Sequence, residues 1–446
     1  MKRTIGIILL LIFLFGFTGI EALATEDNQP SITVSAEGAV LIEQGTGEVL
    51  FQKEMDKKMY PASTTKIMTA LLAIEYGDLD EVVTLGKEVE SISEDSSRAD
   101  LFAGQKLPLS QLLYGLMLPS GNDAANAIAV HIAKKTSNNP SLTEEQAIKE
   151  FAQLMNKKVK EIGAEHTHFV NPHGYHDEDH YTTPLDMAMI SREAMKNQIF
   201  RKIVKTPQLF YRTSKDLENN EEEERSWQNS NELIQQGSRN FYPYAQGIKT
   251  GRTTSAGRCL VSSAVKEDVN VIAVVFKSTE GDVWGDSTKL LSYGIENFKH
   301  HVFAQKEEII TKVKIKNAHP KDPKEMEIIT EKDIKGLIKK EDIPKVNKKI
   351  ESEDNQEIQS SKFQAPIEKG EKVGEITYFL GDKVVAKGNL VAKESIRKKG
   401  FFKAYWWIFI LALPILFIIM NRNAQAKRRK NRARRKKYRF NGQKRN

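Results

Sequence analysis

The run Ser63-Thr64-Thr65-Lys66 is the strongest indication of chemistry in this chain. Pro61 precedes it, and apolar residues at helical spacing follow it over 67–74, so the run is predicted to open a helix. Side chains three positions apart share a helix face, which lets the Lys66 amine reach the Ser63 hydroxyl. Serine becomes a nucleophile when a base takes its proton, and a lysine of lowered pKa can be that base. The spacing therefore predicts an activated serine.

Two further motifs fit the same chemistry. Ser120-Gly121-Asn122 falls between two helical patterns, and Lys249-Thr250-Gly251 falls on a strand-like run. The second run offers a cation, a hydroxyl that can bind an anion, and a glycine that lets a substrate approach the backbone. Each short motif alone is weak evidence: Ser263 and Lys266, or Ser395 and Lys398, repeat the Ser-x-x-Lys spacing. The order of the three motifs and their structural contexts, taken together, support the prediction of an activated serine.

With these three motifs and their flanks, the chain resembles the low-molecular-mass penicillin-binding proteins, the D-alanyl-D-alanine carboxypeptidases. The resemblance covers roughly 35–395 and is carried by residues 60–66, 120–125, 171–174, 247–251 and 365–370. It implies an α/β (α+β) fold of the transpeptidase/β-lactamase-like type, with an antiparallel sheet flanked by helices. A small C-terminal β-rich domain would follow.

The resemblance also implies roles for the residues that match. Ser63 would be the acylated nucleophile, Lys66 its proton acceptor, and Ser120 a relay of a proton to the leaving amine. The substrate-binding residues would be Asn122, Lys249, Thr250, Gly251 and Arg252. Some members carry an arginine before the last helix of this domain; residues 278–285 contain none, so Arg252 or Arg258 would have to replace it.

The predicted function is removal of the terminal D-alanine from peptidoglycan stem peptides through an acyl-enzyme, with β-lactams as covalent inhibitors. One alternative is a penicillin-binding sensor, for which the 26 residues after the apolar segment are too few to form a signalling domain. A weak β-lactamase or a DD-endopeptidase of the same fold is another. A β-lactamase would not ordinarily carry the extra β domain and the membrane anchor.

Five histidines lie within fifteen residues, and this concentration raises the question of a metal site. They are His166, His168, His173, His176 and His180. No His-Glu-x-x-His helix frames them, and Pro172 and Gly174 break the segment into a loop. The loop is therefore predicted to lie at the active-site rim without a metal. No phosphate or dinucleotide glycine motif occurs, and no cofactor is expected.

The two ends of the chain predict export and anchoring. Lys2 and Arg3, an uncharged stretch over 5–20 and Ala22-Leu23-Ala24 have the layout of a signal peptide, residues 1–24. Residues 404–420 are uncharged, with aromatic residues at one end, and are predicted to form a transmembrane helix. A basic tail at 421–446 follows, and the positive-inside rule places it in the cytoplasm, against anionic lipid, with the catalytic domain outside.

The charge distribution argues against a nucleic-acid partner. The chain has 446 residues and a net charge of +8, but 13 Lys and Arg and no acidic residue lie in 421–446. The rest of the chain therefore carries a net −5. The single cysteine, Cys259, excludes an intramolecular disulfide.

Two folded domains are predicted between the ends. The first, 30–301, is the peptidase domain: it begins with a hairpin around 44–47, contains an acidic loop at 215–236 and closes with a helix over 286–300. The second, 302–395, contains short strand patterns separated by glycines and is predicted to be β-rich.

Overall fold

A computed structural model describes residues 32–214, 222–279 and 281–442, and the predicted signal peptide lies outside these residues. The chain divides into two compact units, Met1–Asn297 and Phe298–Asn446. We describe each unit by itself.

The first unit is built on a five-stranded antiparallel sheet in the order β2-β1-β9-β8-β7. Its strands are β1 (Gly38–Glu43), β2 (Val49–Lys53), β7 (Ala245–Thr253), β8 (Gly257–Lys266) and β9 (Val269–Ser278). The predicted hairpin is confirmed as β1–β2. The first and last parts of the unit meet in this sheet, because β1 pairs with β9. The mixed α/β class with an antiparallel sheet is thus confirmed.

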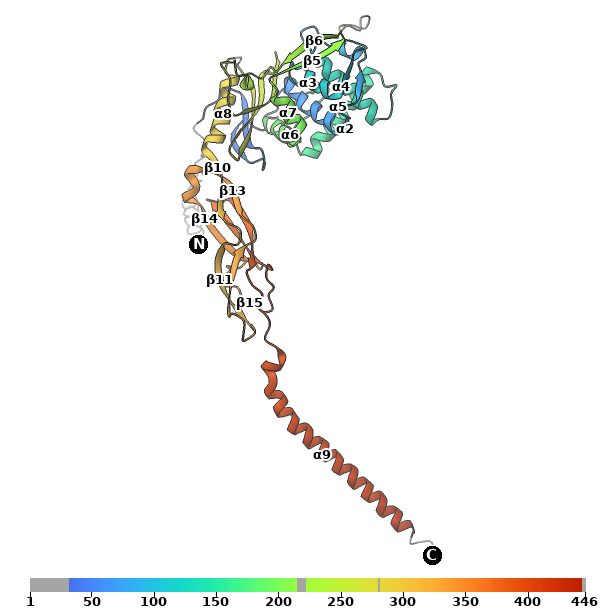
Figure 1. Cartoon of the computed structure of the whole chain (residues 1–446), viewed down its shortest axis with the longest axis vertical. Coiled ribbons are helices and arrows are strands. Elements are labelled where there is room, and N and C mark those ends of the chain that lie inside the picture. The colour runs from blue at the N-terminus through green and yellow to red at the C-terminus, as the bar shows by residue number, and fades with distance from the viewer. Residues whose placement is uncertain (1–31, 215–221, 280, 443–446) are drawn as a thin grey trace, which may run out of the picture. The chain divides into compact units, whose positions relative to one another are not determined.

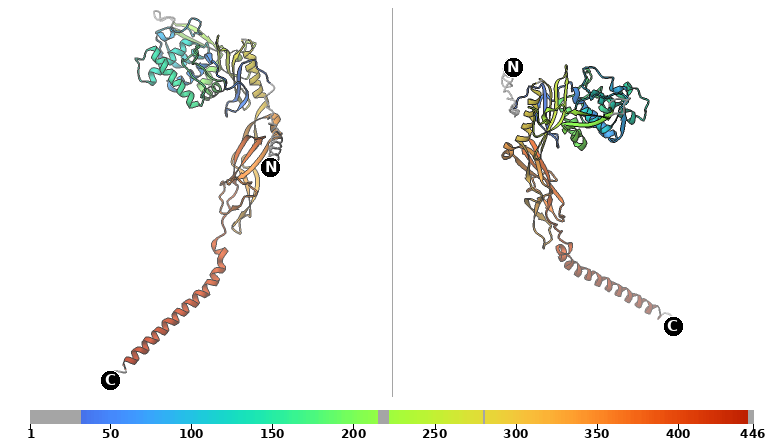
Figure 2. Two further views of the ribbon diagram at one scale, coloured as in Figure 1. Left: turned by 180° about the vertical axis from the view of Figure 1, so that it is seen from behind. Right: turned by 45° about the horizontal axis from the view of Figure 1, so that its top comes forward.

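Helices cover both faces of the sheet (Figures 1 and 2). The helix α8 (Val283–Asn297) packs on β8 and β9, whereas α6 (Pro184–Lys196) and α7 (Gln198–Lys205) pack against β9 and β7 from the helical side. The helices stacked beyond α6 and α7 are α2 (Lys66–Tyr76), α3 (Leu109–Met117), α4 (Asn122–Thr136) and α5 (Glu144–Ile162). One buried apolar cluster joins the sheet to these helices. This rigid packing fixes the helix starts that carry the motif residues.

Short elements complete the unit: η1 (Ala62–Thr65), η2 (Lys87–Val89), η3 (Glu232–Ile234), β3 (Val82–Thr84), β4 (Lys106–Pro108), β5 (Gln208–Ser214) and β6 (Glu222–Gln228). The predicted acidic loop at 215–236 is wrong in part, because β6 pairs with β5 in an antiparallel hairpin. Trp227 explains the strand: it is buried, stacks on Tyr211 and donates a hydrogen bond to the Ala99 carbonyl at 3.0 Å. Burial of this indole fixes the strand that carries the acidic residues.

The second unit consists of strands β10 (Phe298–Ala304), β11 (Ile309–Lys316), β12 (Glu325–Thr330), β13 (Ile334–Lys339), β14 (Asn347–Ser352), β15 (Phe363–Gln364), β16 (Lys372–Leu380) and β17 (Lys383–Ala392), with the turn η4 (Lys340–Lys345). The helix predicted over 286–300 is too long at its C-terminal end. The residues from Phe298 to His300 belong instead to strand β10, which pairs with β13. Strand pairing here overrides the helical spacing, because the residues gain partners in the second unit's sheet. The unit has its own apolar core.

The last element is α9 (Phe401–Gly442), which contains the predicted transmembrane segment and continues into the basic tail. The span Trp406–Arg434 is the one described helix that is long and apolar enough to cross a membrane, as judged by length and composition. Its side chains from 406 to 434 are exposed. Exposure of an apolar stretch of this length is what a lipid-facing segment requires.

Candidate active site

Ser63 and Lys66 are brought together by the junction of two helical elements. Ser63 lies in the 3₁₀ turn η1, and Lys66 is the first residue of α2. In a 3₁₀ turn, side chains three positions apart lie one above the other. The Lys66 Nζ accordingly lies 2.9 Å from the Ser63 Oγ. Ser263 and Lys266 have the same spacing but cannot make this contact. They lie on β8, where side chains three positions apart face opposite sides of the sheet.

Two further oxygen atoms hold the Lys66 amine. Its Nζ donates to the Asn122 Oδ1 at 2.7 Å and to the His173 carbonyl at 3.0 Å. A neutral amine has two hydrogens, and these two acceptors take both. The remaining lone pair is then directed at the third neighbour, the Ser63 hydroxyl, which can donate its proton to it. The arrangement is therefore that of a base held ready for the Ser63 proton.

The environment of Lys66 favours its neutral form. Burial lowers its pKa well below the ordinary value, and the Lys249 charge lowers it further, while Asp123 acts in the opposite direction. Burial also lowers the pKa of Lys249, to about 7. Lys66 is fully buried and Lys249 is 1% exposed, so water does little to stabilise either ammonium. Two lysines within one site thus have lowered pKa values, which is a feature of catalytic sites.

Asn122 is positioned by the start of α4. Its Nδ2 donates to the Ser96 Oγ at 3.0 Å, which leaves the Oδ1 facing Lys66. The next residue, Asp123, accepts hydrogen bonds from the Ala99 and Leu101 backbone N–H groups. This buried carboxylate ties the 96–101 loop to the helix start. The Ser-x-Asn motif therefore depends on Asp123, which lies in the stretch 120–125 that carries the resemblance but was given no role, and on Ser96, which sequence reasoning did not identify.

Ser120 is placed differently from the other motif residues. It is 6% exposed and has a φ of 66°, a left-handed conformation that is uncommon and costly for a residue other than glycine. Within the described residues, its hydroxyl makes no hydrogen bond to Ser63 or Lys66. The structure therefore brings Ser63, Lys66 and Asn122 together directly and leaves the Ser120 hydroxyl outside this hydrogen-bonded group.

The strand β7 carries the third motif past Ser63. A Cβ atom at Gly251 would lie 3.1 Å from the Ser63 backbone nitrogen and 3.0 Å from the Pro61 carbonyl oxygen, so glycine permits the close approach of β7 to η1. The Lys249 Nζ donates to the Thr250 carbonyl at 3.0 Å. The Thr250 and Ser230 hydroxyl groups lie 2.6 Å apart. Two hydroxyls beside a lysine form a suitable place for a carboxylate.

A cleft of about 290 Å³ opens in front of Ser63. It is lined by Ser63, Asp95, Ser96, Ser97, Asn122, His173, Gly174, Tyr175, His176, Arg252, Thr253, Thr254 and Ser255. Arg252, one of the two candidates for the carboxylate-binding arginine, lies at this cleft. Ser96 and Ser230 were missed by sequence reasoning, because nothing local distinguishes them from other loop serines.

The histidine-rich loop, residues 166–180, packs against the turn η1, which carries Ser63. The His180 Nδ1 accepts from the Val170 backbone N–H at 3.1 Å, so its Nε2–H is left to donate to the Thr65 Oγ1 at 2.8 Å. Burial lowers the pKa of both His173 and His180 to about 3, so both are neutral. A Cβ atom at Gly174 would lie 1.8 Å from the Ala62 carbonyl oxygen. No group of three or more potential ligands is arranged for a metal ion in the described part of the chain.

These features agree with the comparisons to known proteins. Residues 23–280, more than half of the chain, match the family model described as D-alanyl-D-alanine carboxypeptidase. The chain belongs to the D-alanyl-D-alanine carboxypeptidase family. Residues 298–398 match the model described as the C-terminal domain of penicillin-binding protein 5. The predicted family and the predicted class, a serine-type hydrolase, are confirmed.

Relatives of this family cover between 60% and 90% of the chain. The D-alanyl-D-alanine carboxypeptidase DacF of Bacillus subtilis is 34% identical over 409 residues, which are 90% of this chain and 96% of the relative. The solved penicillin-binding protein 5 of Haemophilus influenzae covers 83% of this chain and 99% of its own, with 26% identity and a TM-score of 0.61. The Streptomyces K15 DD-transpeptidase covers 60% and 99%, with 34% identity and a TM-score of 0.54.

Proposed function

We propose that this enzyme removes the terminal D-alanine from peptidoglycan stem peptides through an acyl-enzyme at Ser63, and that penicillins acylate the same serine. The observation that carries the proposal is the buried Lys66 amine, which is hydrogen-bonded to Ser63, a residue that lines the cleft. The family supports the reaction class, and the geometry supports the roles of Ser63, Lys66 and Asn122.

In the acylation step, the Ser63 oxygen attacks the carbonyl carbon of the penultimate D-alanine while its proton passes to the Lys66 nitrogen. The negative charge that develops on the carbonyl oxygen would be bound by the backbone N–H groups of Ser63 and Arg252. Such donors typically contribute about 3–4 kcal/mol to the transition state. The C–N bond then breaks, and the departing amine receives a proton, with Ser120 as the relay. Water afterwards attacks the ester, releases the shortened peptide and restores the Ser63 hydroxyl.

The substrate carboxylate would lie against Thr250 and Ser230, whose hydroxyl groups are already side by side. Lys249 would add positive charge beneath them. Asn122 would bind the substrate amide through its side chain. Since the Ser120 hydroxyl is engaged by neither Ser63 nor Lys66, it is available to the leaving amine once substrate is bound.

Hydrolysis is proposed over transfer to a second peptide, although the relatives carry both names: the Bacillus subtilis protein is called a carboxypeptidase and the Streptomyces K15 protein a DD-transpeptidase. Support for hydrolysis comes from the matching family model, which is described as D-alanyl-D-alanine carboxypeptidase, and from the Bacillus subtilis relative of the same name, which is matched over 96% of its length.

A pentapeptide incubated with the purified enzyme should yield free D-alanine and tetrapeptide, with few crosslinked dimers even when acceptor amine is abundant. Mass spectrometry of the products tests for hydrolysis. Mass spectrometry of the enzyme after treatment with penicillin tests for acylation at Ser63. Dimers in excess of tetrapeptide would contradict the carboxypeptidase assignment while leaving the Ser63 chemistry in place.

We further propose that α9 crosses the cell membrane once, with the catalytic unit outside and the basic tail in the cytoplasm. The length and composition of Trp406–Arg434 support the crossing, and the unbroken basic tail supports the orientation. Protease added to cells stripped of their wall should digest residues 25–400 and spare an epitope at the C-terminus. Loss of that epitope in intact cells would reverse the orientation.

A further inference from the structure

A cavity of about 530 Å³ lies between α7 and the sheet. It is lined by Gln44, Met195, Gln198, Arg201, Lys202, Lys205, Gln246, Val265 and Asn270. Most of these residues belong to α7 or to the strands β7, β8 and β9. None of the nine lines the cleft at Ser63, and the mechanism proposed above uses none of them. A volume of this size is typical of a small-molecule site.

The amphipathic sequence of α7 places its basic residues at this cavity. The helix buries three apolar side chains in the core, those of Phe200, Ile203 and Val204. Its other face is polar, and the residues of that face that line the cavity are Gln198, Arg201, Lys202 and Lys205. Arg201 and Lys205 are four positions apart, so their charges repel each other along one side of the helix. An anion bound between them would relieve this repulsion.

The lining carries three positive charges and no carboxylate. The Arg201 Nη1 donates to the Met195 and Lys196 carbonyls at 2.6 and 2.9 Å, which holds the guanidinium in place without neutralising it. The ammonium groups of Lys202 and Lys205 have neither a hydrogen bond nor an ion pair among the described residues. The cavity therefore favours an anion.

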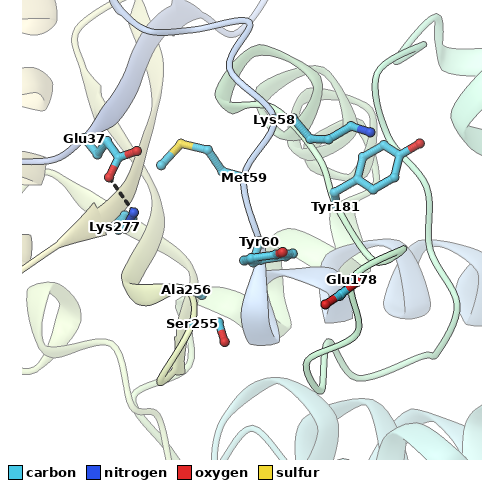
Figure 3. Close-up of a pocket in the computed structure, with 9 residues that line it drawn as sticks. All are labelled: Glu37, Lys58, Met59, Tyr60, Glu178, Tyr181, Ser255, Ala256 and Lys277. Carbon is cyan, nitrogen blue, oxygen red and sulfur yellow. Dashed lines mark ion pairs between the residues drawn. The ribbon is translucent and has the colours of Figure 1, made fainter.

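A smaller cavity of about 180 Å³, beside Tyr60, shows the contrast (Figure 3). Its lining includes two carboxylates, Glu37 and Glu178, and two lysines, Lys58 and Lys277. Glu37 pairs with Lys277 at 2.7 Å, drawn as a dashed line in Figure 3, and the charges of Glu178 and Lys58 are of opposite sign. The formal charges of that lining cancel, so it selects neither sign, whereas the charges at α7 have no counterpart in their own lining.

Four amide side chains complete the lining of the cavity at α7: those of Gln44, Gln198, Gln246 and Asn270. The Gln246 Nε2 donates to the Tyr244 carbonyl at 3.0 Å, which leaves its Oε1 as an acceptor. The amides of Gln44, Gln198 and Asn270 make no side-chain hydrogen bond among the described residues, and the Gln44 Oε1 is also buried. An ionised carboxylate or phosphodiester has no proton to donate to such acceptors, whereas a hydroxyl group both donates and accepts. The lining therefore suits an anion that also carries hydroxyl groups.

We propose that this cavity binds a polyol phosphate, a compound that carries a phosphate group and several hydroxyl groups. Arg201, Lys202 and Lys205 bind the phosphate, and the amides bind the hydroxyl groups. A phosphate monoester carries about −1.5 to −2 charges at pH 7 and offers three acceptor oxygens, which suits three cations better than a carboxylate does. The inference does not depend on the proposed reaction at Ser63, so either can fail without the other.

Acetylation of lysines by a water-soluble succinimidyl ester, followed by mass spectrometry, measures each lysine of the full-length enzyme separately. Anions bound by the basic tail, 421–446, therefore do not obscure the result. We expect sn-glycerol 3-phosphate to slow the acetylation of Lys202 and Lys205 by about threefold or more, because a phosphate-bound ammonium group is shielded from the reagent. Lys160, which is exposed in the last turn of α5, should react at an unchanged rate.

Two matched compounds separate the roles of charge and hydroxyl groups. n-Propyl phosphate has the same phosphate and the same number of carbon atoms but no hydroxyl group. It should need about a threefold higher concentration for the same protection, the scale of a net hydrogen bond. Glycerol, which has no charge, should give no protection.

Lys205→Gln tests the site through its effect on Lys202. The concentration of sn-glycerol 3-phosphate that half-protects Lys202 should rise about three- to fivefold, the scale of one exposed ion pair. Lys160→Gln removes an exposed lysine from the last turn of another helix and should leave this concentration unchanged. The double variant Gln44→Met, Asn270→Leu removes two amides without a change of charge, so the preference over n-propyl phosphate should shrink.

Four results would each overturn the inference: no protection, equal protection of Lys160, equal potency of n-propyl phosphate, or unchanged values in both Lys205→Gln and the double variant. A linear trimer of glycerol phosphate identifies the source of the ligand. If the trimer protects at lower concentration than the monomer, the ligand is part of a polymer, and if the monomer does, it is a free compound. Tetraglutamate that protects at lower concentration than either would indicate an acidic protein segment and contradict the proposal.

Discussion

Replacement of Ser63 by alanine should abolish covalent labelling by a fluorescent penicillin and lower D-alanine release by about 10⁴-fold or more, the scale of losing a nucleophile. The substitution removes one oxygen atom at a partly exposed position, and it costs one hydrogen bond to Lys66. We therefore expect the thermal unfolding midpoint to change little. Gel fluorescence and mass spectrometry of the labelled peptide measure the effect.

Ser395→Ala is the matched control for this experiment, since Ser395 and Lys398 repeat the Ser-x-x-Lys spacing. Ser395 lies outside any helix, and its hydroxyl accepts a hydrogen bond from the Lys369 backbone N–H at 2.9 Å. This variant should label as fully as the unmodified enzyme. Equal labelling of Ser63→Ala would remove Ser63 from the mechanism.

Replacement of Lys66 by methionine should slow acylation by about 10²–10⁴-fold, the usual contribution of a general base. Methionine fills a similar volume without an amine, so the buried site should stay packed. Stopped-flow measurement of acylation by penicillin gives the rate. Lys149→Met, the same change on the exposed surface of α5, should have no effect. An unchanged rate in Lys66→Met would exclude Lys66 as the base.

The two lysines also predict the pH dependence of kcat/KM. Lys66 acts without its proton, so activity should rise with pH through its lowered pKa. Lys249 acts as a cation, so activity should fall as pH rises through its pKa of about 7. Burial lowers the Lys66 pKa, and the charge on Lys249 lowers it further. In Lys249→Met the falling limb should vanish and the rising limb should move to higher pH.

The local parts of the site could be predicted from the sequence, because they depend on spacing alone. Ser63 and Lys66 are three residues apart on one turn, and their contact follows from helix geometry. The contact between the Lys66 amine and the His173 carbonyl joins positions 107 residues apart, and it depends on Gly174 packing against Ala62. No local pattern specifies such a contact, although residues 171–174 were noted as part of the family resemblance.

Other differences between the predictions from sequence and the structure also depend on features that no local pattern specifies. Trp227 was not expected to fix a strand, because its burial against the Ala99 carbonyl depends on a loop distant in sequence. The helix α8 ends at Asn297 since the following residues pair with β13, whose pattern is 36 residues further along the chain. The left-handed backbone of Ser120 is equally invisible in a sequence, because serine rarely adopts it and nothing nearby demands it.

The position of β7 in its sheet affects the range of compounds that this enzyme can bind. Since β7 is the last strand of its sheet, no other described strand lies along one of its sides, and this is the strand that passes Ser63. An extended peptide laid along it would be held as an added strand, by main-chain hydrogen bonds that do not depend on side-chain identity. An unpaired strand edge can also pair with other protein chains, and the packing of η1 against β7 limits such pairing. Recognition by backbone would admit any compound that presents an amide in the right place, so the proposed acylation by penicillins would not require a peptide side chain.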